Sequence, residues 1–480
     1  MILCKGSATL VGVVNLSERR RSWDRPVSNT SGRIQLSAVC LIAALGGASE
    51  LTQAHAGSGF VLRSQSTTLL GSALAGMMTE SDNASLIVNN PASLGWGSGR
   101  QAVFGGTPIF TAAHFRDGVA DTLLGTPISG GDGGNNGTKA FLPNLYAATD
   151  VAPEFRVGLG VTSLYGLSST WQPGWLGRYY AISSQLVTYD ILPTLSYRPN
   201  QWLSVGIAPI VQFARAKSNT AIDFGTIDQI ALGGLGGGRP GLDDGSVSTR
   251  TSAWSAGVQV GTLFEPMPGT RVGAAYRSQI RRDLQGTAQY QTGGPVGDAV
   301  ATVTGAFTPG NIRLGLSMPA TATAGVSQQI GDAVTIMADL QWVGWHTLQG
   351  LTITSENPTQ SPVTTLLDWH NSWFFAAGVH YRIDEEFSLR LGAAYDQTPT
   401  RSNTRTPLIP DADSYWAAVG IEWQISPTVS FEAAYGHIFV TTGGVSLSAN
   451  APGNASRGSL SGNISGGSVD YLSMQIVSRF

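Results

Sequence analysis

Residues 414–440 read SYWAAVGIEWQISPTVSFEAAYGHIFV, and this stretch decides the fold. From Tyr415 to Ile425 every second residue is apolar or aromatic, whereas Glu422 belongs to the other set. The same alternation resumes over residues 429–435, after a short turn. Because successive side chains of a strand point to opposite faces, this pattern predicts two antiparallel strands, each with one continuous apolar face.

The alternation recurs along the chain, at residues 254–264, 334–342, 373–381 and 387–395. A soluble β-sandwich would also alternate, so other features must decide. The apolar faces run for five or six positions, which suits a tilted strand of about 9–11 residues that crosses a bilayer. Trp and Tyr gather at the strand ends, as they do in the aromatic girdles of membrane barrels. We therefore predict an all-β protein, a closed transmembrane barrel whose strands leave no backbone group unpaired in lipid.

The composition agrees with a large membrane sheet. Charged residues make up 12% of the chain, about half of the usual share of roughly 25%. Gly is abundant, and Lys occurs only at Lys5, Lys139 and Lys217, which is unlike a protein of long soluble helices. The net charge of −3 gives no indication of nucleic-acid binding.

Residues 1–56 are predicted to be a signal peptide with an N-terminal extension longer than such a signal requires. Arg33 precedes an apolar run at 36–45, and the small-residue triplet at 54–56 places cleavage just before Gly57. After that point no apolar run reaches the 18 residues that a transmembrane helix would need.

We predict fourteen antiparallel strands over residues 101–480, an even number that brings both ends of the barrel to the periplasmic side. A cylinder of this size has a lumen that needs filling, and residues 57–100 precede the first strand. We therefore expect residues 57–100 to form an N-terminal hatch that plugs the lumen. The predicted strands begin near Gln101, Ala140, Phe155, Ser184, Trp202, Ser252, Arg271, Ala322, Val334, Trp373, Phe387, Ser414, Val429 and Val469.

The last strand ends in an aromatic residue. Counted back in steps of two from Phe480, the chain shows Ser478, Ile476, Met474 and Leu472. A terminal Phe that closes an amphipathic strand resembles the signal read by the barrel-assembly machinery, which we therefore expect as a partner during insertion.

Several stretches of the chain resemble one family. Residues 57–94 look like the hatch of the FadL family of outer-membrane long-chain fatty-acid and aromatic-hydrocarbon transporters, with Asn-Pro-Ala at Asn90, Pro91 and Ala92. Similar matches, in the same order as in the family, lie at residues 165–209, 274–286, 316–349 and 393–421.

The resemblance implies a passive, monomeric transporter in the outer membrane of a Gram-negative bacterium, surrounded by outer-membrane lipid and lipopolysaccharide. Its ligand would be a hydrophobic small molecule, either a long-chain fatty acid or a related hydrocarbon. The family also implies release of this cargo through a side opening at an inward kink of the third strand.

The residues of the third strand agree with such a kink. Its outward face is regular over 155–161, and then degrades at Ser163 and Gly166. Gly inside a strand often marks a bulge or bend, because it has no side chain to pack. The simpler alternative is that a loop starts near Ser163, with no opening.

Alternation also places charged residues on the inward faces. Two roles are open for them: ion pairs that hold the plug, or one Arg that meets a substrate carboxylate. These candidate lumen residues are Arg277, Arg281, Asp339, Arg382, Arg390, Asp396, Glu422 and Glu432.

The sequence predicts no catalytic, cofactor-binding or metal-binding residues. Cys4 and Cys40 both precede the cleavage site, so neither a disulfide nor a thiolate metal site is expected in the mature chain. An enzyme built on such a barrel would need a His beside a Ser or Asp at the rim. The remaining alternative to a hydrophobic-compound transporter is a general diffusion porin or a purely structural barrel, although neither would need a plug of this length.

Overall fold

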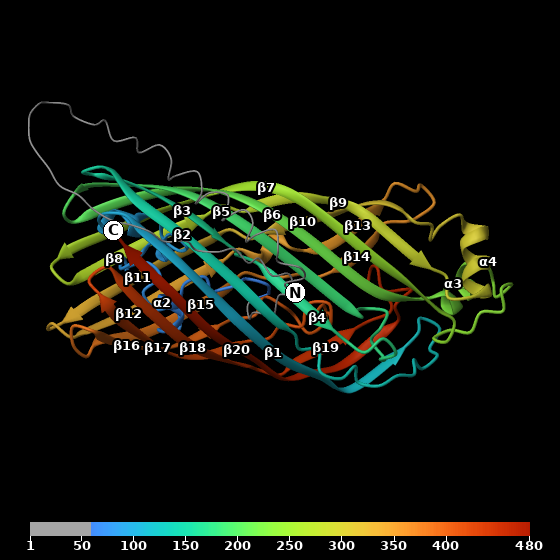
Figure 1. Cartoon of the computed structure of the whole chain (residues 1–480). Coiled ribbons are helices and arrows are strands. Elements are labelled where there is room, and N and C mark those ends of the chain that lie inside the picture. The colour runs from blue at the N-terminus through green and yellow to red at the C-terminus, as the bar shows by residue number, and fades with distance from the viewer. Residues whose placement is uncertain (1–58) are drawn as a thin grey trace, which may run out of the picture. The chain divides into compact units, whose positions relative to one another are not determined.

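The computed structural model describes residues 59–480, and the predicted signal peptide lies outside this range. Within these residues, twenty strand segments form one sheet, and β1 (Gln101–Asp121) pairs with β20 (Ser459–Arg479), so the sheet closes. Figure 1 shows the strands running side by side at a steep slant around the barrel. Among the described helices, none has the length and apolar character that a membrane span requires.

The other strands follow one another around the barrel in chain order. They are β2 (Lys139–Ala152), β3 (Phe155–Thr162), β4 (Gly166–Thr170), β5 (Ser183–Asn200), β6 (Leu203–Asp223), β7 (Asp244–Met267), β8 (Thr270–Arg277), β9 (Ile280–Gln291), β10 (Gly310–Met318), β11 (Thr321–Ile330), β12 (Val334–Val343), β13 (Gly350–Ser355), β14 (Val363–Leu366), β15 (Ser372–Arg382), β16 (Phe387–Asp396), β17 (Ser414–Ser426), β18 (Val429–Val440) and β19 (Gly443–Leu447). The helical segments are α2 (Thr67–Leu70), η1 (Ala84–Val88), η2 (Pro91–Trp96), α3 (Phe224–Ala231), α4 (Pro295–Thr304) and η3 (Trp345–Thr347).

Some barrel strands are interrupted, so the twenty segments correspond to fewer barrel strands, as the prediction of fourteen requires. In the described part of the chain, six pairs of consecutive segments each continue one barrel strand, so the twenty segments make a closed barrel of fourteen antiparallel strands. For example, β7 pairs with β8 along one half of its length and with β9 along the other half. The predicted fold class is therefore confirmed.

The two faces of the strands agree with the predicted alternation. On β17, Tyr415, Ile421 and Trp423 are exposed, whereas Trp416 and Ala418 are buried. On β20, the exposed apolar residues are the ones counted back from Phe480 in steps of two. The outward apolar stripe is the surface that a bilayer would cover, because large apolar side chains are stable there only when they are out of water.

The connections differ in length at the two ends of the barrel. At one end they are short, as between β15 and β16 or between β17 and β18. At the other end they are long and carry helices α3 and α4, which Figure 1 shows beyond the strand ends.

Residues 60–95 lie against the inward faces of the barrel strands and are almost all buried. Gly71 of this segment lies so close to β17 that a Cβ atom added to it would be 2.9 Å from the Cα atom of Gly420. Two glycines facing each other allow this close approach of the two backbones. We refer to residues 59–100 as the N-terminal segment.

Candidate functional site

An apolar cavity of about 450 Å³ lies inside the barrel, next to the start of the N-terminal segment. This volume falls within the range of roughly 300–1,000 Å³ that is typical of small-molecule sites. Leu167, Leu186, Leu314 and Leu316 contribute to its wall, and Phe60 of the N-terminal segment also borders it. The cavity therefore suits a ligand with a large hydrophobic part.

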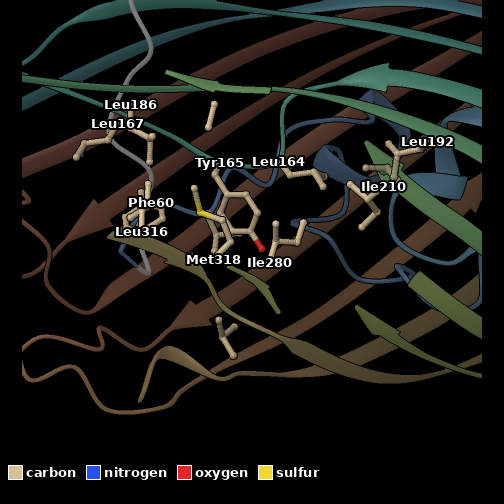
Figure 2. Close-up of a cluster of buried hydrophobic side chains, with 14 of the residues drawn as sticks. Phe60, Leu164, Tyr165, Leu167, Leu186, Leu192, Ile210, Ile280, Leu316 and Met318 are labelled. Carbon is tan, nitrogen blue, oxygen red and sulfur yellow. The ribbon is translucent and has the colours of Figure 1, made fainter. Parts of the chain in front are cut away.

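Phe60 sits in an aromatic box beside this cavity. The centroid of its ring lies 4.7 Å from that of Trp345, 5.8 Å from that of Trp369 and 6.1 Å from that of Tyr165. These rings belong to a larger buried apolar cluster, part of which is drawn in Figure 2. Tyr165 connects the cluster to the third barrel strand, because it lies in the interruption between β3 and β4.

The third barrel strand loses one of its two neighbours at this interruption. β3 pairs with both β2 and β5, but among the described strands β4 pairs with β5 alone. On β2, residues 139–144 pair with β1 only. The sheet is thus interrupted between β2 and β4: Ser163 is the first of the three residues of the break, and Gly166 is the first residue of β4 after it.

The backbone of the break is satisfied by groups outside β2. The Leu164 amide donates to Asp190 Oδ2 at 2.8 Å, and the Tyr165 amide donates to Thr188 Oγ1 at 3.1 Å. The Gly166 amide donates to the Phe60 carbonyl at 3.0 Å. Because buried backbone groups need partners, side chains of β5 and the N-terminal segment hold this part of the strand away from a regular ladder.

Ion pairs join the N-terminal segment to the inward faces of the strands. Arg390 on β16 contacts Glu80 at 3.0 Å and Asp82 at 2.9 Å. Arg63 contacts Asp396 at 3.1 Å, and both side chains are buried. Burial raises the pKa of the Glu80 carboxyl, and the nearby guanidinium of Arg390 opposes this rise.

Inward carboxylates also accept hydrogen bonds from the segment. Asp339 accepts from the Met78 amide at 3.1 Å, and Glu432 accepts from the Thr68 hydroxyl at 2.6 Å. Asn90 caps η2 by accepting from the Ala92 amide at 3.0 Å, and it donates to the Thr262 carbonyl of β7 at 3.1 Å. Pro91 occupies the first turn of η2, where its lack of an N–H costs nothing.

The prediction for Arg281 is wrong, because this side chain is exposed on the outer face while its neighbour Arg282 is only 7% exposed. The strand is interrupted after Arg277, which still faces inward and donates to the Val88 carbonyl. A one-residue shift in phase exchanges the two faces of a strand.

Two further candidate lumen residues lie near the short-turn end of the barrel. Arg382 is also exposed, at the end of β15, whereas Glu422 is half-buried and accepts a hydrogen bond from Ser388 at 3.4 Å.

Asp190, Gln212 and Arg282 are buried polar residues near the break that the sequence reasoning missed. Asp190 and Gln212 are fully buried, on β5 and β6. Asp190 is two residues from the inward-facing Thr188 on β5, and Gln212 is two residues from the inward-facing Ala214 on β6. The alternation of each strand would therefore have placed both side chains in the lumen.

A histidine–carboxylate pair lies on the outer face of the barrel. His437 Nδ1 on β18 is 2.7 Å from Asp470 Oδ1 on β20, and the Tyr435 hydroxyl donates to the same oxygen at 2.6 Å. The Tyr435 hydroxyl also lies 3.5 Å from the His437 imidazole.

Replacing Asp396 with Ala is expected to destabilise the protein by about 3–5 kcal/mol, because it leaves the buried Arg63 guanidinium without its counter-charge. Denaturant unfolding of the protein in detergent would measure this change. Arg239→Ala is the matched control, since it removes an exposed ion pair with Asp243 and should leave stability unchanged. Equal stability of both variants would show that the Arg63 pair does not hold the segment.

Comparisons with known proteins agree with this architecture. Residues 48–480 match the family described as outer membrane protein transport protein (OMPP1/FadL/TodX). Outer membrane protein P1 of Haemophilus influenzae is 26% identical over 84% of this chain and 89% of its own length. The long-chain fatty acid transport protein of Escherichia coli K12 is 24% identical over 79% of this chain and 87% of its own length.

Solved structures show the same barrel. A FadL homologue of Pseudomonas aeruginosa superposes with a TM-score of 0.80 and 26% identity, covering 88% of this chain and all of that one. The toluene transporter TbuX of Ralstonia pickettii has a TM-score of 0.61 at 18% identity, covering 85% of this chain and 97% of its own. The chain belongs to the OMPP1/FadL/TodX family of outer membrane transport proteins.

Proposed function

We propose that this protein carries hydrophobic small molecules, long-chain fatty acids or related hydrocarbons, passively across the outer membrane of a Gram-negative bacterium. The observation that carries the proposal is the apolar cavity beside the interrupted third strand. The names of its relatives support the cargo class, since they include a long-chain fatty acid transport protein and a toluene transporter.

The proposed route leaves the cavity sideways. Leu167 and Leu186 line the cavity and also lie on β4 and β5, at the break itself. Ion pairs and hydrogen bonds join residues 63–90 to the inward faces of the strands. A downward path would require the cargo to displace these packed and hydrogen-bonded groups, whereas lipid beyond the break is as apolar as the cavity.

The alternative of a general diffusion porin requires an open aqueous lumen. The buried N-terminal segment argues against such a lumen, because its side chains pack directly on the inward faces of the strands. We therefore propose that residues 59–100 act as a plug.

Filling the cavity tests the proposed transport function. Ala216→Trp adds a large ring to the cavity wall and is expected to abolish uptake of a labelled long-chain fatty acid by cells that lack their own transporter. Val211→Trp is the matched control, since Val211 lies on the outer face of the same strand β6 and should leave uptake unchanged. Unimpaired uptake by the Ala216→Trp variant would show that cargo does not pass through this cavity.

A further inference from the structure

Two groups of aromatic side chains mark the edges of the bilayer on the outer face of β6 and β7. Near the short turns, the ring centroids of Trp202 and Phe264 lie 5.5 Å apart. Toward the long connections, the Phe213 ring lies 5.2 Å from that of Trp254 and 6.4 Å from that of Tyr189. Trp254 and Phe264 share one face of β7, and a tilted strand of about ten residues spans about 25 Å, the height of the apolar band of a membrane barrel.

Cations follow directly beyond the second aromatic group. Arg215 and Lys217 continue the outward face of β6 beyond Phe213, and Arg250 continues the exposed face of β7 beyond Trp254. Lys217 and Arg250 are direct partners across the β6–β7 ladder. Because every second residue of a strand shares a face, the three cations lie on one side of the sheet, away from the lumen.

Arg313 on β10 adds a cation to the same region. Its side chain is exposed, whereas its neighbour Ile312 is buried on the inward face. Strands β6, β7, β9 and β10 run side by side here (Figure 1), and Arg313 pairs with Gln285, which pairs with Ser252, two residues from Arg250. Two strand spacings and two residues of rise separate the Cα atoms of Arg250 and Arg313 by roughly 12 Å. We define the basic patch as Arg215, Lys217, Arg250 and Arg313.

The protein itself does not neutralise the arginines of the basic patch. In the part of the chain that the structure describes, none of these three arginines forms an ion pair, not even with Asp283 or Glu356 at the edges of the patch. Lys217 and Arg250 also carry like charges directly opposite each other, which is an unfavourable arrangement in a ladder. An anion bound between the two strands would relieve this repulsion.

We propose that the basic patch binds the phosphorylated head of lipid A, the membrane anchor of lipopolysaccharide. The long connections of such a barrel face the outside, so the patch lies at the level of the head groups of the outer leaflet. A guanidinium fork matches the oxygens of a phosphate, and clusters of Lys and Arg at a membrane surface attract anionic lipid heads.

The spacing of the patch suits this lipid in particular. Lipid A carries a phosphate at each end of its disaccharide, and the patch offers one cationic group at Lys217 and Arg250 and another at Arg313. Its acyl chains would then cover the outward apolar stripe below Trp254. This site lies on the outer face, so the inference goes beyond the proposed transport function and does not depend on it.

The test measures lipid binding to the full mature chain in detergent by titration in native mass spectrometry. We expect the unmodified protein to bind diphosphorylated lipid A more tightly than phosphatidylglycerol, and lipid A stripped of its phosphates to lose this advantage. The double variant Arg250→Gln, Arg313→Gln should weaken binding of diphosphorylated lipid A by at least about tenfold. Its matched control is Arg116→Gln with Arg382→Gln, which removes two exposed cations of β1 and β15 and should leave the affinity unchanged.

Three results would overturn the inference: equal affinities for lipid A with and without its phosphates, equal affinities for lipid A and phosphatidylglycerol, or an equal loss in the two double variants. The comparisons among lipids use the unmodified protein, so they decide the question even if a variant fails to fold. Arg250→Lys with Arg313→Lys should retain part of the affinity, because lysine keeps the charge and loses the paired donors.

Discussion

Deletion of residues 59–96 is expected to turn a closed barrel into an open channel, with discrete current steps in planar bilayers that the intact chain lacks. The proposed plug packs buried side chains against the inward faces of the strands, among them Leu69, Leu70 and Leu74. A barrel of fourteen strands is too wide for its own inward side chains to close it. Removing the segment should therefore leave a continuous aqueous path.

The strand ends should survive this deletion. Arg100 and Phe480 exchange two backbone hydrogen bonds, of 3.1 and 3.0 Å, and neither residue is removed. Deleting α4 is the control, because this helix lies beyond the strand ends, away from the plug (Figure 1). A deletion variant that folds but conducts no current would mean that another part of the chain blocks the lumen.

The barrel could be predicted from sequence because the bilayer imposes one rule on every strand. Outward residues must be apolar, so alternation is visible wherever a strand crosses lipid. The predicted starts of β3, β12, β16 and β17 agree with the structure. The starts of β7 and β20 were placed several residues too late, at Ser252 and Val469 instead of Asp244 and Ser459. These extensions carry both polar and apolar residues on each face. Such a pattern suits strands that continue beyond the membrane, where the outward side chains need not be apolar.

The site was only partly predictable, because its partners are distant in sequence. Ser163 and Gly166 could be singled out from the loss of alternation, but nothing in the sequence indicates that Phe60 would accept a hydrogen bond from Gly166. The error at Arg281 has a related cause. A break of two residues at Ser278 and Gln279 changes the phase of the strand, and alternation alone cannot show such a break.

Crosslinking β2 to β4 is expected to reduce uptake of a hydrophobic ligand to background while leaving ligand binding intact. In the β2–β3 ladder, Leu145 faces Val161, and continuing this register would place Ala140 opposite Gly166. The double variant Ala140→Cys, Gly166→Cys would be joined by a short bifunctional maleimide. The sequence contributes no other cysteine after the predicted cleavage site, so the reagent has only these two targets.

The control pair is Ala147→Cys with Leu159→Cys, which are already opposite each other in the regular part of the same ladder. A crosslink there uses the same reagent but joins two residues that are already paired in the ladder, so uptake should stay at the level of the unmodified protein. Continued uptake after crosslinking at 140 and 166 would show that the cargo leaves by another path.

Measuring binding and uptake separately makes this experiment specific for sideways release. Leu167 and Leu186 next to the break line the cavity, so a crosslink between β2 and β4 would close the proposed exit without filling the site. A route straight down through the lumen would be insensitive to that crosslink, but it would require the contacts of Arg63 and Arg390 with the strands to break in each cycle. A state in which these buried ion pairs are broken lies several kcal/mol higher for each pair, so passage through it would be slow. The proposed sideways release would leave these ion pairs intact, because it involves the break, where the amides of Leu164, Tyr165 and Gly166 are held by β5 and Phe60.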